Sequence, residues 1–183
     1  MTKENHNNAS QEQLSQIDIK LAELCNTDEK RQQVMRLIME ILNADSIIRL
    51  DANDIIDTLS YSNPLTAIDV SVSATATNRM NTLVEKIKEK TSDCHPFMSL
   101  LVYLFFPEDH PLLMAELQPL IDWLPYAETD SEIKTRWGMA HYEPSSEGKL
   151  RAIVLVVTDQ MERYFLPSIW ARDFKPRKKL KET

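Results

Sequence analysis

The stretch SIIRLDANDIID, residues 46–57, carries the pattern on which the predicted fold depends. Its first residues form a short extended link. Asp51 is a residue type that caps helices, and Asn53 and Asp54 place polar groups in the first turn, where the helix dipole favours them. An apolar side follows, made of Ile55, Ile56 and Leu59. The stretch therefore predicts a short helix that begins with two aspartates.

Two helices are expected before this stretch, over residues 13–25 and 29–43. In the second, apolar residues occupy the complete i, i+3, i+4, i+7, i+8 pattern of an amphipathic helix. They are Val34, Leu37, Ile38, Ile41 and Leu42. Residues 1–12 are polar and are expected to be disordered.

Four strands are expected after the stretch. Residues 67–76 alternate between apolar and polar types, as in a half-buried strand, whereas residues 97–106 are apolar and predict a central strand buried on both faces. Residues 132–142 and 149–158 are expected to pair as a hairpin across a six-residue turn.

Helices are expected between these strands, over residues 77–90 and 111–124, with a kink at Pro119. The whole order predicts an α+β fold of two layers, a four-stranded mixed sheet packed on helices, with extra helices at the N-terminus. We expect one domain over residues 13–158, followed by an aromatic segment and basic tail over residues 159–183.

The composition limits the classes of function. The chain has 183 residues and only two glycines, so the usual glycine-rich phosphate loops cannot form in it. The formal net charge is −7, and residues 171–183 hold six basic and two acidic residues, which leaves −11 for residues 1–170. An acidic body argues against a broad nucleic-acid surface, and only the basic tail remains a candidate for one.

The cysteines and histidines predict neither a disulfide framework nor a metal site, because Cys25 and Cys94 form no paired motif and the histidines lack ligand spacing. No apolar run reaches the roughly 18–20 residues that span a membrane, and the N-terminus lacks the apolar run of a signal peptide. We therefore expect a cytoplasmic protein without a cofactor and without a catalytic site of its own.

The element order from Ile47 onward resembles the C-terminal domain of the FtsZ/tubulin superfamily, and bacterial FtsZ in particular. In that family a long core helix leads into a loop of the form N-x-D-x-x-D, and residues 49–54 here read RLDAND. The helix start Asn78-Arg79 and the step Trp137-Gly138 resemble two further features of the family. The resemblance covers about residues 28–158.

The sequence departs from the family in several places. The glycine-rich nucleotide domain is not found in these residues, Arg49 replaces the asparagine of the loop, and residues 69–73 read DVSVS where the family has a glycine-rich strand. Residues 13–25 have no counterpart. We therefore expect no autonomous nucleotide site.

The resemblance also implies what the loop does. In the family, its acidic residues enter the nucleotide site of the neighbouring subunit and polarise the attacking water, and Asp51 and Asp54 match those positions. It therefore implies a cytoskeletal or cell-division protein with a contact surface that includes Arg49, Asp51, Asn53 and Asp54. The competing interpretation is local, with Asp51 as a helix cap and Asp54 as a partner of the helix dipole.

Three functions stay open on this basis. The first is a non-catalytic interaction module that binds or caps an FtsZ-like partner or polymer. The second is the trans-acting half of a split GTPase, in which Asp51 and Asp54 complete a partner's nucleotide site. The third is a repurposed FtsZ-like domain, for which a homo-oligomer is one arrangement.

The C-terminal segment offers a second candidate surface. Phe165, Ile169 and Trp170 precede the basic tail, an arrangement found in docking peptides. The alternative is that these side chains fold back onto the body as a last helix, because a tryptophan is costly to expose.

Overall fold

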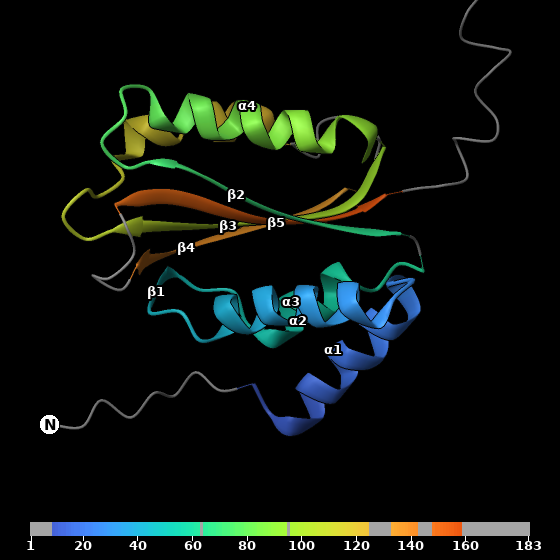
Figure 1. Cartoon of the computed structure of the whole chain (residues 1–183). Coiled ribbons are helices and arrows are strands. Elements are labelled where there is room, and N and C mark those ends of the chain that lie inside the picture. Colours follow the sequence, from blue (N-terminus) through green and yellow to red (C-terminus); the bar gives the residue numbers. More distant parts are fainter. Residues whose placement is uncertain (1–8, 63, 95, 125–132, 143–147, 159–183) are drawn as a thin grey trace, which may run out of the picture.

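The computed structural model describes residues 9–62, 64–94, 96–124, 133–142 and 148–158. Its centre is a five-stranded sheet in the order β1-β4-β3-β5-β2 (Figure 1). The strands are β1 (Ser46–Ile48), β2 (Leu65–Ser73), β3 (Phe97–Pro107), β4 (Lys134–Tyr142) and β5 (Lys149–Thr158). The β3–β4 pair is parallel and the other pairs are antiparallel, so the predicted α+β class and mixed sheet are confirmed.

Helices cover both faces of this sheet (Figure 1). One face carries α1 (Gln11–Leu24), α2 (Asp28–Leu42) and α3 (Ala52–Thr58). The other carries α4 (Arg79–Thr91), α5 (Gln118–Trp123) and the short 3-10 helices Ser92–Cys94 and Met114–Leu117. The fold therefore has three layers, where two were expected.

The strand β3 explains the third layer. Leu100, Val102 and Leu104 point into the core under α4, while Leu101 and Tyr103 point into the core under α1, α2 and α3. All five side chains are fully buried. Because each such side chain contributes about 1.5–3 kcal/mol when buried, helices are needed on both faces of the sheet. The predicted central strand is confirmed.

The predicted hairpin of β4 and β5 is wrong, because β3 lies between them. Leu101 pairs with Arg136 of β4 on one side and with Leu155 of β5 on the other. A strand that is apolar on both faces belongs at the centre of a sheet, where both rows of its backbone groups find partners. Adjacency in sequence suggested a hairpin, but the two strands flank β3 instead.

Three boundaries also differ from the prediction. The fifth strand, β1, was expected to be an extended link, but it pairs with β4 through Ser46 and Ala140. The helix α1 begins at Gln11, inside the segment expected to be disordered, because Ser10 caps it through a reciprocal capping box. In place of one helix over residues 111–124 kinked at Pro119, the structure has a 3-10 helix followed by α5, and Pro119 lies at the start of α5, where its missing N–H leaves no bond unmade.

The α4 helix begins in an unusual way. Asn78 has a φ of 59° and makes no side-chain cap bond. The next residue, Arg79, is buried and donates to the backbone carbonyls of Ala74, His110 and Pro111 and to the carboxylate of Glu116. The Asn-Arg start therefore ties α4 to the loop that follows β3.

Candidate interaction face at the start of α3

The α3 helix begins where the sequence predicts, with Asp51 as its cap. The Oδ1 atom of Asp51 accepts from the backbone amides of Asn53 at 2.8 Å and Asp54 at 3.0 Å. Asp54 returns the interaction, since its Oδ2 accepts from the amide of Asp51 at 3.0 Å. This reciprocal box explains why a short helix forms here, and it confirms the capping role of Asp51.

Asp51 is exposed and keeps one carboxylate oxygen open. Its cap uses Oδ1 alone, and no residue in the described part of the chain donates a hydrogen bond to Oδ2. A carboxylate oxygen held in a fixed direction at the surface can accept a hydrogen bond from a partner without first breaking an internal one. Asp51 therefore caps α3 through one oxygen and, among the described residues, leaves the other available as an acceptor.

Asp54 is engaged within the molecule. Its Oδ1 accepts from Nε of Arg136 at 3.0 Å, and the same guanidinium donates through Nη2 to Asp57 at 2.8 Å. With Oδ2 in the capping box, both carboxylate oxygens of Asp54 have partners. The arginine bridges two acids on one side of α3 and ties this helix to β4, so Asp54 is a structural residue rather than an open one.

Sequence reasoning missed Arg136. It lies 82 residues from Asp54 along the chain, and its side chain is 21% exposed. The three acids Asp51, Asp54 and Asp57, spaced three apart, indicate that a cation is needed nearby. No local pattern identifies which one, because the contact depends on the position of β4 in the sheet.

A hollow of about 210 Å³ lies beside the cap. It is lined by Ala9, Gln13, Leu42, Arg49, Leu50, Asp51 and Ala52. Arg49 is exposed, so the hollow has an exposed base and an exposed acid in its wall. We call the surface formed by Gln13, Arg49, Asp51 and Asn53 the α3 face; it includes three of the four predicted residues, while Asp54 turns towards Arg136.

Trp137 and Gly138, the predicted aromatic-glycine pair, lie in β4, where Gly138 packs against β1 and Tyr103. A Cβ atom on Gly138 would lie 2.7 Å from Cε2 of Tyr103 and 2.8 Å from the carbonyl oxygen of Ile48. Tyr103 is fully buried, and its hydroxyl lies 2.6 Å from Oγ of Ser46, while desolvation by burial raises the pKa of its phenol. The glycine therefore allows β1 to lie close to β4 and Tyr103, and Arg49 is the residue that directly follows β1.

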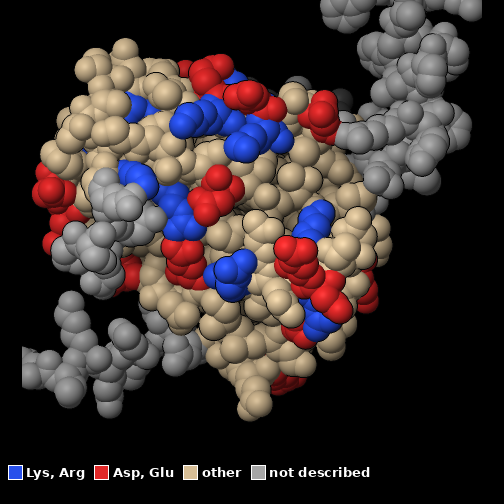
Figure 2. Space-filling view, viewed as in Figure 1, with Lys and Arg blue, Asp and Glu red and all other residues tan. Residues whose placement is uncertain are grey.

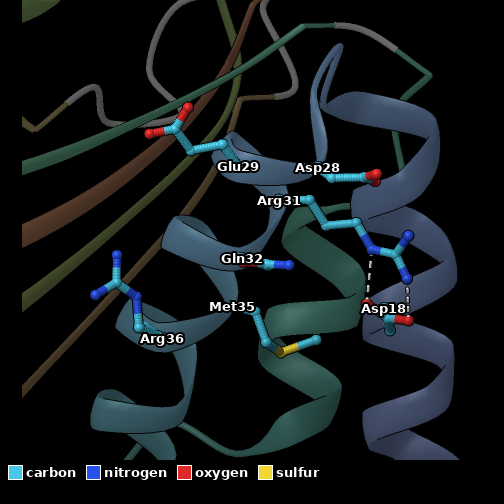
Figure 3. A pocket seen from close by; sticks show the side chains of 7 residues that line it. All are labelled: Asp18, Asp28, Glu29, Arg31, Gln32, Met35 and Arg36. Atoms are coloured by element: carbon cyan, nitrogen blue, oxygen red, sulfur yellow. Dashed lines mark hydrogen bonds and ion pairs between the residues drawn. The ribbon is translucent and has the colours of Figure 1, made fainter.

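A larger hollow, about 580 Å³, lies between α1 and α2. Figure 3 shows Arg31 reaching from α2 to Asp18 on α1, where the two side chains form an ion pair. The hydrogen bond from Arg31 lowers the pKa of the Asp18 carboxyl. The other side chains that line it are mostly polar helix-surface residues. This pair fastens α1 to α2, and we assign the hollow no other role.

Two other sequence features bear on a possible second site, the metal-ligand residue types and the C-terminal segment. Within the described ranges, no group of three or more histidine, cysteine or acidic residues could hold a metal ion. Acidic and basic side chains are interspersed on the face shown in Figure 2. Phe165, Ile169 and Trp170 and the basic tail lie outside the described residues.

Among the residues that the structure describes, no helix has both the length and the apolar character needed to cross a membrane. Cys25 and Cys94 are both free thiols.

The sequence matches no protein-family model, and no curated protein is similar to it at a significant level. The fold does have similar solved structures. A mutant of FtsZ from M. jannaschii matches with a TM-score of 0.52 and 15% identity, over 77% of this chain and 45% of the FtsZ chain.

Two further structures are similar to this chain. An empty FtsZ dimer from M. jannaschii gives a TM-score of 0.49 and 17% identity, over 78% of this chain and 44% of that one. GDP-bound CetZ1 from Haloferax volcanii gives a TM-score of 0.49 and 19% identity, over 73% of this chain and 40% of the CetZ1 chain. The chain thus spans less than half the length of these proteins, and at such low identity the likeness concerns the fold alone. The structure shows that this chain has the fold of part of an FtsZ-like protein, as the sequence resemblance predicted.

Proposed function

We propose that this chain is a non-catalytic, FtsZ-like interaction module that binds an FtsZ-like partner or polymer through the α3 face. The observation that carries the proposal is the state of the two aspartates. Asp51 offers an open, exposed oxygen, whereas both oxygens of Asp54 are engaged inside the molecule. The face thus has one fixed carboxylate for a partner on a fold similar to part of FtsZ.

The predicted single domain over residues 13–158 would carry this module. We place it in the cytoplasm, in a cytoskeletal or cell-division setting, as the sequence resemblance implies. A copy that offers only the α3 face to a head-to-tail polymer would end it, because the next subunit would find no second interface. The proposal therefore includes capping as well as binding.

The proposal is tested by sedimenting FtsZ polymer formed with GTP, with and without the full chain. We expect the pelleted polymer mass to fall as the chain is added in substoichiometric amounts, if it caps, or the chain to appear in the pellet, if it binds along the polymer. An unchanged polymer mass with no chain in the pellet would refute both forms of the proposal.

The split GTPase is the second candidate, and the open oxygen of Asp51 favours it. A carboxylate at this position could orient a water molecule in a partner's site. The engagement of Asp54 by Arg136 counts against it, because a second free acid is missing. The variant Asp51→Ala separates the two functions: a split GTPase loses a partner's GTP turnover while binding persists, whereas an interaction module loses binding.

A further inference from the structure

The first turn of α3 is held from outside by a residue of α1. Nε2 of Gln13 donates to Oδ1 of Asn53 at 3.1 Å, although the two residues lie 40 positions apart. The other amide atom of Gln13, Oε1, accepts from the backbone amide of Ser10 at 2.9 Å in the α1 capping box. Both ends of the Gln13 amide are therefore engaged, and its orientation is fixed.

The helix that carries Gln13, α1, is anchored to the rest of the molecule. Ile17 and Leu21 of α1 are fully buried, and the Asp18–Arg31 ion pair fastens α1 to α2 (Figure 3). The reciprocal box at Ser10 and Gln13 keeps the first turn of α1 from fraying. Gln13 is thus held by the core of the molecule at the rim of the hollow beside Asp51.

The α3 helix depends on such contacts. It has seven residues, and a helix of that length is not stable in water without tertiary packing. Ala52, Ile55 and Thr58 anchor its buried side, whereas the exposed Asn53 side chain is tied to α1 by its bond to Gln13. The backbone amide of Asn53 in turn donates to Oδ1 of Asp51 at 2.8 Å, which sets the direction of the open Oδ2 atom.

We propose that Gln13 is a positioning residue for the open carboxylate oxygen of Asp51, and that α1 is therefore part of the α3 face. This inference rests on the proposed function for its biological meaning. It also indicates the kind of partner that fits: the hollow presents Arg49 and Asp51 together with the neutral amide of Gln13, which is bonded to Asn53. Such a surface is complementary to a protein surface that offers both an acidic and a basic side chain, rather than a patch of one sign.

A set of exchanged side chains tests the role of Gln13 in the full chain. Gln13→Glu still accepts from Ser10, and the Asn53 amide can turn and donate to it. Asn53→Asp still accepts from Gln13. The double variant Gln13→Glu with Asn53→Asp places two carboxylates against each other and has no donor between them. The control is Gln16→Glu with Asn53→Asp, which has the same net charge because each change again replaces a neutral amide by a carboxylate, and Gln16 is an exposed residue of α1.

Amide hydrogen exchange at Asn53 and Asp54 is the first readout, since both amides donate to Asp51. We expect each single variant to exchange as the unmodified chain does, and the double variant to exchange about fivefold faster than the control double, as the loss of one hydrogen bond implies. If Gln13 only capped α1, the double variant and the control double would exchange at the same rate, because residue 13 accepts from the Ser10 amide in both. Equal exchange in the two doubles would overturn the inference.

Affinity for FtsZ is the second readout, and it separates this inference from the proposed function. We expect the double variant to bind about fivefold more weakly than the control double. If the unmodified chain does not bind FtsZ, the proposed function fails, and the exchange measurement still decides the role of Gln13. If the chain binds and the two doubles bind equally, the function stands and the positioning role is refuted.

Discussion

Arg79 shows how one buried charge can hold three segments together. The residue is 7% exposed, and its guanidinium donates hydrogen bonds to three carbonyl oxygens and one carboxylate. An arginine can be buried only when its donors are met in this way, because an unpaired buried charge is costly. The arginine of the Asn-Arg start is therefore a structural residue at the far side of the sheet from the α3 face.

The partner of Arg79 gives the stability a pH dependence. The hydrogen bond from Arg79 lowers the pKa of Glu116 from its usual value of 4.5. A carboxyl with a lowered pKa in the folded state stabilises the fold above its unfolded pKa, and this contribution is lost as the pH falls through the folded value. We expect Glu116→Gln to be less stable than the unmodified chain near neutral pH, with a difference that shrinks below about pH 4.5.

Urea unfolding at a series of pH values measures this difference. Glu89→Gln, an exposed glutamate of α4, serves as the control. A gap between the unmodified chain and Glu116→Gln that stays constant as the pH falls would show that the ion pair with Arg79 does not contribute in this way.

Gly138 is required for a close approach rather than for backbone freedom. We expect Gly138→Ala to lower the free energy of unfolding by about 1–3 kcal/mol, because the new methyl group would meet both the Tyr103 ring and a backbone oxygen of Ile48. Gly148 is a matched contrast, with open space around it but a φ of +56°. Asparagine tolerates that conformation, so Gly148→Asn should cost less than Gly138→Asn in the same urea measurement. Equal costs at the two positions would contradict this explanation.

At the scale of elements, the sequence pattern predicted those helices and strands that depend on interactions between residues close together in the chain. The apolar run of β3, the amphipathic period of α2 and the Asp51 cap each follow from neighbouring residues, and each is found in the structure. The predicted hairpin failed because strand neighbours are set by the burial of β3 on both faces, which is a property of the whole sheet. The edge strand β1 has only three residues, too few for an alternating pattern to identify it.

In the candidate site, too, the sequence predicted some residues and missed contacts between distant parts of the chain. The sequence resemblance identified Arg49, Asp51 and Asn53, which lie together on the α3 face. It could not show that Asp54 is held by Arg136, nor that Gln13 contacts Asn53, because both contacts join elements far apart in the chain. The distinction between an open and an engaged aspartate needed the three-dimensional structure.

The contact between α3 and β4 can be tested directly. We expect Arg136→Gln to lower the free energy of unfolding by about 1–2 kcal/mol, since it leaves Asp54 and Asp57 close together without a cation between them. Arg136→Lys should recover little, because a single ammonium group cannot reach both acids with the geometry of a guanidinium. Chemical unfolding monitored by circular dichroism provides the measurement. A fully stable Arg136→Gln variant would show that the bridge is incidental.

At the scale of the whole molecule, the sheet separates two hydrophobic cores that support different parts of the surface. The core under α4 and α5 includes the Arg79 cluster at its border, whereas the core under α1, α2 and α3 supports the α3 face. The likeness to FtsZ covers 45% of the FtsZ chain and shows the fold. The functional proposal therefore depends on the α3 face, and above all on Asp51.

The most direct test of this account is a binding titration of the full chain against FtsZ, with Asp51→Asn as the decisive variant. Asparagine caps helices as well as aspartate does, so this change removes the charge and keeps α3. We expect Asp51→Asn to bind about tenfold more weakly, as the loss of a charge-assisted hydrogen bond implies, while Asp93→Asn, at an exposed position in the 3-10 turn after α4, binds as the unmodified chain does. Equal affinity of Asp51→Asn and the unmodified chain would contradict the central claim that the open carboxylate of Asp51 carries the interaction.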